Sequence, residues 1–325
     1  MRALSDLGFE QRIVTGKNNP INAELAKAGI AFENILPCKE SGYIRYSLGA
    51  QSPVTAADAV FTYTGPDQTL AVNAKKKGVK TIRIILDARV PKNNPFALQL
   101  HGKTDLIIVP SRLEEERFLK RVPLAGHTYL LEGHYERKGP LMENSGEERL
   151  QFIHIARSSK IKGHGDILKA LSILKREGTG FDAVFIGNEA EIPFAVLAKE
   201  ANALGIEENV RFSGFAADIE EYLALASIGL IGSLGSEVYS RVLYEYFAFG
   251  LPVAATAVGI IPEVFGNVRF GELANPGDPR SFAEALKKVI KGRAVYSKNV
   301  TEYYMKNLTF DAFRSRVSAL TDFLK

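Results

Sequence analysis

The second half of the chain alternates between short apolar runs and stretches with helical spacing. The apolar runs are continuous rather than alternating, as expected for parallel strands that helices cover on both faces. Between them, apolar residues recur three and four apart, which predicts helices. The pattern therefore predicts a doubly wound α/β domain. The expected strands are 149–157, 182–187, 209–214, 227–233 and 251–257, and the expected helices are 165–178, 193–205, 218–226, one opening at Ser240 and Arg241, and 281–292.

The first half repeats this alternation less regularly, which predicts a second Rossmann-like unit. Expected strands are 11–16, 58–65, 80–87 and 104–111, and expected helices are 22–29, 69–78 and 114–122.

We expect an N-terminal domain over 1–135 and a C-terminal domain over 150–307, because the polar, glycine-bearing stretch 136–149 between them is typical of a linker. The last stretch, 308–325, predicts an amphipathic helix that packs back on the N-terminal domain. The opening residues predict the end of a helix followed by a strand, so we expect the N-terminal domain to lack its usual first strand. A truncated start and a diverged protein both agree with that opening.

Composition limits the class of protein. The chain has 325 residues, 46% of them hydrophobic and 24% charged, which fits a folded protein of two domains. A net charge of +4 suits an anionic ligand but is far below that of a typical nucleic-acid binder. The single cysteine, Cys38, excludes an intrachain disulfide and favours a reducing compartment. No apolar run is long enough to span a membrane, so we expect a cytoplasmic protein, with peripheral membrane contact as the alternative.

The loop after the first strand of the second half is basic. Arg157, Lys160 and Lys162 lie between that strand and the start of the next helix. Cations beside the free amides of a helix N-terminus make a phosphate site. A solvated basic loop explains the same residues, because Lys and Arg side chains are usually exposed.

A second loop favours the ligand-binding interpretation. Glu237 precedes the helix that opens at Ser240, and Glu245 lies inside that helix. Gly235 and Ser236 come directly before Glu237. Ligands of open α/β sheets bind beyond the carboxyl ends of the strands, where this loop and the basic loop are both expected. Carboxylates accept hydrogen bonds from hydroxyl pairs, so cations and carboxylates together are typical of a nucleotide-sugar site. Taken without the basic loop, the two glutamates are better explained as solvated helix residues.

These motifs carry a resemblance to a known family. The segment 236–264 resembles the E-x7-E segment of the retaining GT-B glycosyltransferases of family 4, and Arg157 with Lys162 resembles that family's paired phosphate-binding cations. Residues 204–215 and 276–290 match its following segments. Residues 82–111 look like the acceptor-side domain of bacterial envelope-glycan members.

The resemblance implies a role for each matching residue. Arg157 and Lys162 would neutralise the diphosphate, Glu237 would bind hydroxyls of the donor sugar, and Glu245 would bind the ribose. The family needs no metal and no cofactor beyond the nucleotide sugar, and this chain has no Asp-x-Asp pair. The backbone around the helix start would touch phosphate and ribose, and an aromatic ring would lie near the base: Ser240, Arg241, Val242, Leu243 and Phe215.

One catalytic position departs from the family. Many relatives carry a histidine at the end of an N-terminal-domain strand, and the best-matching residue here is Asp87. Asp87 either takes over that role or caps a loop turn. Another histidine, His164, follows the basic loop, and we expect it to be exposed at the surface.

The resulting hypothesis is a retaining, metal-independent GT-B enzyme. It would move a sugar from a nucleotide diphosphate to a hydroxyl acceptor, such as lipopolysaccharide or another envelope glycan. A catalytically inert nucleotide-sugar-binding protein and a UDP-sugar epimerase on the same fold are the alternatives. A nicotinamide dehydrogenase is disfavoured because Leu168 replaces the third glycine of the required fingerprint.

Overall fold

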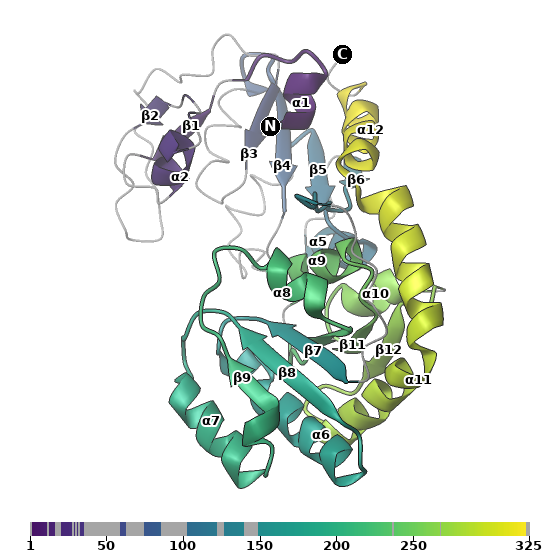
Figure 1. Ribbon diagram of the computed structural model, residues 1–325. Coiled ribbons are helices and arrows are strands. Elements are labelled where there is room, and N and C mark those ends of the chain that lie inside the picture. Colours follow the sequence, from purple (N-terminus) through teal and green to yellow (C-terminus); the bar gives the residue numbers. More distant parts are fainter. Residues whose placement is uncertain are drawn as a thin grey trace. The chain divides into compact units, whose positions relative to one another are not determined.

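The computed structural model describes residues 2–11, 13–16, 21–27, 29, 31, 33–35, 59–62, 75–85, 103–121, 127–139, 149–235, 237–266 and 268–322 (Figure 1). The chain forms two compact α/β units. The first comprises Met1–Val109, Glu115–Leu131 and Phe313–Lys325, and the second comprises Pro110–Glu114 and Glu132–Ala312. Most of the expected linker, 136–149, lies outside the described residues.

The first unit contains a parallel sheet in the order β3-β4-β5-β6 and a separate parallel pair, β1-β2. One face of the larger sheet buries Ile107 and Val109 with Phe118, and the other buries Ile82 and Leu106 with Leu320, near the C-terminus. The elements with residues in this unit are α1 (Arg2–Asp6), β1 (Val14–Gly16), α2 (Ile21–Lys27), β2 (Glu33–Ile35), β3 (Ala59–Thr62), β4 (Lys80–Ile84), β5 (Leu106–Val109), α5 (Arg112–Arg121), β6 (His127–Leu130) and α12 (Phe310–Thr321).

The second unit contains a parallel sheet in the order β12-β11-β10-β7-β8-β9, as the apolar runs predict. Its strands are β7 (Leu150–Ile155), β8 (Phe181–Ile186), β9 (Val210–Phe212), β10 (Ile228–Ile231), β11 (Val253–Thr256) and β12 (Gly271–Ala274). Its helices are α6 (His164–Arg176), α7 (Phe194–Ala203), α8 (Glu220–Leu225), α9 (Arg241–Ala248), α10 (Ile261–Phe265) and α11 (Pro279–Tyr303), with 3-10 turns at Lys160–Lys162 and Glu207–Asn209 and a π turn at Tyr304–Leu308.

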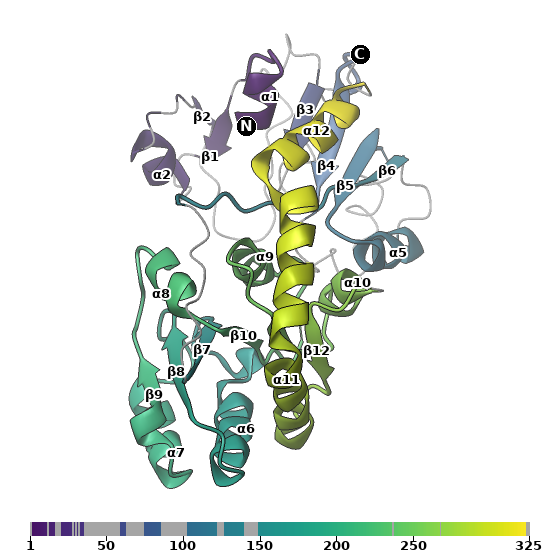
Figure 2. The same cartoon turned by 45° about the vertical axis from the view of Figure 1, so that its right-hand side comes forward.

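Helices lie on both faces of this sheet (Figure 2). Two apolar clusters, one on each face, hold the sheet between them. Strand residues such as Phe152 and Phe185 pack with α6, α7 and the first part of α11. Their neighbours along the strands, such as Ile153, pack with α9, α10 and the end of α11. This arrangement confirms the doubly wound interpretation, since successive residues of one strand point to opposite faces.

The structure also adds elements that the sequence did not predict. Strands β2, β6 and β12 and helix α10 had no clear periodicity of their own, and α11 is longer than the predicted 281–292. Part of the sheet is less covered than expected, because the β8 side chains of Asp182 and Val184 are only half-buried. Helix α8 has only six residues and covers little of that face, and the neighbouring edge strand β9 has only three.

Candidate functional site

The order of the strands places a switch point between β7 and β10. From β7 the chain winds outward through β8 and β9, and then returns to β10 on the other side of β7. The loops that follow these two strands therefore leave the sheet side by side at its carboxyl edge. This is where open α/β sheets bind their ligands.

The two loops are joined through their backbones. The Leu234 amide donates to the Ile161 carbonyl at 2.8 Å. Gly163 has a positive φ of 66°, and a Cβ there would lie 1.9 Å from the Gly232 carbonyl oxygen. Glycine is therefore required at 163, both for its backbone conformation and for this close approach.

Helix α9 is fixed over the same point by Tyr246. Its ring covers Gly229 of β10, where a Cβ would lie 2.3 Å from the ring. Its hydroxyl donates to the Ile153 carbonyl of β7 at 3.0 Å and accepts from the Ile155 amide at 3.1 Å. One tyrosine thus ties α9 to both strands of the switch point.

Lys162 and Glu237 form an ion pair across the switch point. Lys162 ends the 3-10 turn after β7, and its Nζ donates to Oε1 of Glu237, which follows β10. The Glu237 side chain is buried, with only 5% exposed, whereas that of Lys162 is 25% exposed. Ser233 Oγ also donates to Glu237 Oε1, at 2.5 Å. These contacts bring together a cation and a carboxylate that the sequence assigned to one site.

The backbone of Glu237 is held by a third loop, which follows β11. The Ile260 amide donates to the Glu237 carbonyl at 2.7 Å. Gly259 has a φ of 61°, and a Cβ there would lie 2.1 Å from the same carbonyl oxygen. Three loops of one sheet edge therefore fix the position of this carboxylate.

Glu245 is buried on α9, with a side chain 7% exposed. Its partner is Arg241, one helical turn earlier, whose Nε donates to Glu245 Oε1 at 2.9 Å. Burial raises the pKa of the Glu245 carboxyl above its ordinary value, and the nearby Arg241 charge opposes that shift. The Arg241 side chain itself is 75% exposed.

The residues at the start of α9 differ in how deeply their side chains are buried. Leu243 is buried in the apolar cluster, and its amide donates to the Ser240 carbonyl at 3.0 Å, whereas Val242 is half-buried. Ser240 is the N-cap and is buried, yet its Oγ has no hydrogen-bond partner among the described residues. This hydroxyl has no role within the described part of the fold.

The other predicted residues are less constrained. Arg157 is exposed beyond the end of β7, and its side chain forms no hydrogen bond or ion pair with the described residues. Phe215 is 71% exposed after Gly214, whose carbonyl accepts from the Gly187 amide at 2.8 Å. A Cβ at Gly235 would meet only ordinary contact distances, so packing does not require glycine there. Asp87 and Ser236 lie outside the described residues.

Two buried histidines lie beneath the Lys162 loop, which corrects the expectation that His164 is exposed. The His154 and His164 rings are nearly perpendicular, with centroids 4.6 Å apart, and both are buried. His154 Nδ1 donates to the Leu230 carbonyl at 2.9 Å, which assigns its proton to that nitrogen. Burial lowers the pKa of His154 far below its ordinary value and lowers that of His164 to about 4. Both rings are therefore neutral at physiological pH, beside a lysine whose charge reinforces that state.

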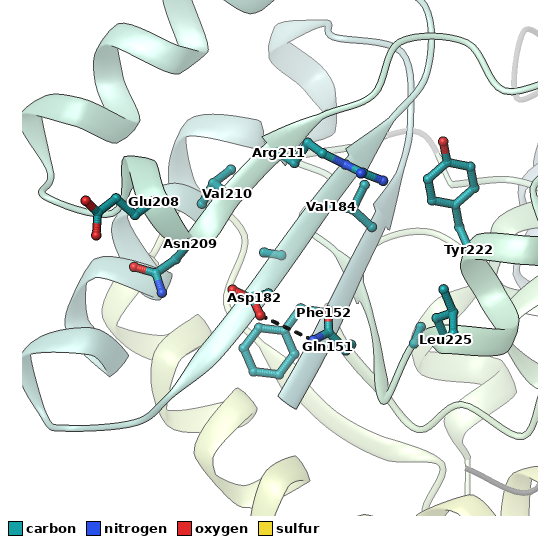
Figure 3. Close-up of a pocket in the computed structure, with 12 residues that line it drawn as sticks. Gln151, Phe152, Asp182, Val184, Glu208, Asn209, Val210, Arg211, Tyr222 and Leu225 are labelled. Atoms are coloured by element: carbon teal, nitrogen blue, oxygen red, sulfur yellow. Dashed lines mark hydrogen bonds between the residues drawn. The ribbon is translucent and has the colours of Figure 1, made fainter. Parts of the chain in front are cut away.

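A separate hollow lies on the sheet face near α8, away from the predicted residues. Its volume is about 380 Å³, and its lining includes Asp182, Arg211, Tyr222 and the exposed Leu225 (Figure 3). The Arg211 guanidinium lies 5.7 Å from the centroid of the Tyr222 ring. The lining residues come from the beginnings and middles of β7 to β9, from the 3-10 turn before β9 and from α8 and the residue after it, and they include none of the predicted site residues.

Sequence reasoning missed Ser233 and the buried state of His164. Ser233 had a signal, since it lies only four residues before Glu237 in a loop already assigned to the site. His164 had none, because its burial depends on packing against His154 and Phe185. Within the described ranges, no group of three or more His, Cys, Asp or Glu side chains is placed to hold a metal ion. None of the helices in those ranges is long and apolar enough to cross a bilayer.

The fold defines a Rossmann-like α/β class of protein, and comparison with known proteins identifies the family. Residues 142–306, half of the chain, match the model of the glycosyl transferases group 1 family. The chain belongs to that family.

Curated relatives match over the same half. The chain is 29% identical over 164 residues to N-acetyl-alpha-D-glucosaminyl L-malate synthase of Bacillus anthracis, covering 50% of this chain and 42% of the relative. It is 32% identical over 155 residues to the amylovoran biosynthesis glycosyltransferase AmsK of Erwinia amylovora, covering 45% and 37%. The matches thus span less than half of the length of these relatives.

Solved structures resemble the whole chain. A glycosyltransferase from Rickettsia africae superposes with a TM-score of 0.81 at 16% identity, covering 99% of this chain and 92% of that one. HepE of Anabaena, in complex with UDP and glucose, gives 0.72 at 19% identity, covering 96% and 91%. At these identities the likeness establishes the fold, which is that of GT-B glycosyltransferases with two Rossmann-like α/β domains.

Proposed function

We propose that this protein transfers a sugar from a nucleotide diphosphate to a hydroxyl acceptor, with retention of configuration and without a metal ion, as a member of glycosyltransferase family 4. The observation that carries the proposal is the Lys162–Glu237 ion pair across the switch point of a sheet in this family. The E-x7-E spacing from Glu237 to Glu245 supports the retaining subclass.

The chemistry follows from where charge develops. As the bond between sugar and nucleotide breaks, negative charge builds on the departing diphosphate. Lys162, the exposed Arg157 and the positive end of the α9 helix dipole supply positive charge at the sheet edge, and such preorganised charge lowers the barrier. Glu237 accepts from hydroxyls of the donor sugar, and Glu245 accepts from the ribose. We place Ser240, the Arg241–Leu243 backbone, Gly235 and Ser236 beside phosphate and ribose, Phe215 beside the base, and Asp87 beside the donor sugar.

We further propose that the donor is a UDP-sugar and that the acceptor is a glycan of the cell envelope. HepE has been crystallised with UDP-glucose, and relatives are named for amylovoran biosynthesis and for the lipopolysaccharide outer core. An acceptor of that kind suits a cytoplasmic protein that makes peripheral contact with the inner face of the membrane. The family match favours a transferase over an epimerase.

The test is calorimetric titration of the full chain with UDP, GDP and ADP, followed by assay of each matching nucleotide sugar with and without lipid-linked glycan acceptors. We expect UDP to bind most tightly and the product to keep the anomeric configuration of the donor, as read by proton NMR. Binding without turnover would favour the inert nucleotide-sugar-binding alternative. An isomeric nucleotide sugar formed without acceptor would identify an epimerase.

A further inference from the structure

Glu237 holds its two carboxylate oxygens in different environments. Oε1 accepts from both Lys162 Nζ and Ser233 Oγ. Oε2 has no hydrogen-bond partner among the described residues. Each carboxylate oxygen has about two acceptor sites, so the two donors occupy Oε1 fully. Oε2 is therefore the oxygen left for a hydroxyl of a ligand.

Ser233 is itself fixed in place. It is buried two residues after the end of β10, with 1% of its surface exposed, and its carbonyl accepts from Thr256 Oγ1 at 2.5 Å. Thr256 is the last residue of β11, the neighbouring strand. The hydroxyl that orients Glu237 therefore belongs to a residue tied to two strands.

The two donors to Oε1 differ in what a ligand does to them. Lys162 is a partly exposed cation, so a phosphate bound at the sheet edge competes with Glu237 for its ammonium group. Ser233 is neutral and buried, so a phosphate at the sheet edge does not draw its hydroxyl away from Glu237. When Lys162 turns to phosphate, Ser233 Oγ is the donor that stays on Oε1.

We propose that Ser233 is a positioning residue that keeps Oε1 of Glu237 occupied and so presents Oε2 to the donor sugar. This inference rests on the proposed function, because it assigns Glu237 to sugar hydroxyls. Ser233 touches neither phosphate nor nucleoside in this proposal. Its effect is therefore confined to the sugar part of the donor.

The test compares UDP with UDP-glucose, UDP-galactose and UDP-N-acetylglucosamine by calorimetry on the full chain. Ser233→Ala should weaken the tightest-binding UDP-sugar about tenfold and leave UDP unchanged, because a hydrogen bond to a charged group is lost only where that group is used. Ser233→Thr keeps the hydroxyl and should restore the affinity. Ser172→Ala is the matched control, since Ser172 is buried in the same unit and its Oγ donates to the Leu204 carbonyl at 2.9 Å. It should change neither affinity.

The outcomes separate this inference from the proposed function. Equal losses for UDP and UDP-sugar in Ser233→Ala, or no loss in either, would overturn the positioning role while leaving the nucleotide site in place. The positioning role also fails if no UDP-sugar binds more tightly than UDP to the unchanged chain. Failure to bind UDP, GDP, ADP or their sugars would remove the proposed function and this inference together.

Discussion

Glu237 and Glu245 bracket one short segment and are both buried, yet the structure supports them in different ways. Glu237 receives its donors from two loops, through Lys162 and Ser233. Glu245 receives one donor from its own helix, through the exposed Arg241. A carboxylate held by tertiary contacts is fixed in orientation, whereas one held by a helical neighbour depends on a side chain that solvent can reach.

Similar burial thus does not give the two carboxylates similar support. Burial raises the pKa of Glu245 even with Arg241 beside it. Lys162, the partner of Glu237, lies near the neutral pair His154 and His164, where burial and, to a smaller extent, the Lys162 charge lower the pKa of both rings. We therefore expect changes on the Glu237 side to have the larger effects, on both turnover and folding.

The largest effect should follow Lys162→Ala. Loss of a cation that stabilises leaving-group charge should lower turnover about 10²–10³-fold. The variant also leaves Glu237 buried without its counter-ion, so the melting temperature of the variant should fall.

Arg157→Ala should lower turnover by a similar factor without loss of stability, because Arg157 is exposed and unpaired among the described residues. Lys169→Ala is the control, since that lysine is exposed and its ion pairs lie on the surface. Wild-type turnover in both site variants would refute the charge-stabilising role.

The next effect concerns pH and the histidines beneath the Lys162 loop. The pKa of His164 is about 4 in the folded protein and 6.5 in its ordinary state, so the unfolded chain binds more protons between these values. The contribution of His164 is therefore complete above pH 6.5 and is lost as the pH falls toward 4. At pH 5 this loss should be about 2 kcal/mol. Urea denaturation of the wild type and of His164→Gln, at pH 8 and pH 5, measures it. Equal pH dependence in the two proteins would contradict a neutral buried His164.

A smaller effect should follow Glu245→Gln. The ribose is remote from the bond that breaks, so donor affinity should fall about tenfold while turnover at saturation stays near wild type. Glu272→Gln is the control, because Glu272 also accepts from an arginine three residues away but lies on the edge strand β12. An unchanged donor constant in Glu245→Gln would remove Glu245 from the ribose.

The smallest effect concerns Arg241 and its influence on the pKa of Glu245. Because burial raises the pKa of Glu245 and Arg241 opposes this, Arg241→Gln should raise that pKa further. UDP affinity requires the ionised carboxylate in our proposal, so it should decline as the pH is lowered, and the decline should begin at a higher pH in the variant. Parallel pH profiles of UDP affinity for the two proteins would show that Arg241 does not control Glu245.

Much of the second unit could be predicted because its signals are local. Continuous apolar runs indicated β7, β8, β10 and β11, and helical spacing indicated α6, α7 and α9. Short elements such as β12 and α10 were not predicted, because they contain too few residues to define a hydrophobic period. The domain boundaries and the roles of all the predicted site residues stay predictions, and Asp87 and Ser236 also lie outside the described residues.

The sequence by itself determined the alternation of strands and helices, and it determined that Lys162 and Glu237 follow strands of one parallel sheet. These properties depend on periodicity and chain direction, which neighbouring residues fix. Only the tertiary structure decided that β7 and β10 are adjacent, so that two residues 75 positions apart form an ion pair with Ser233 beside them. It also decided that His164 is buried, because burial depends on which distant side chains pack around a residue rather than on its neighbours in the chain.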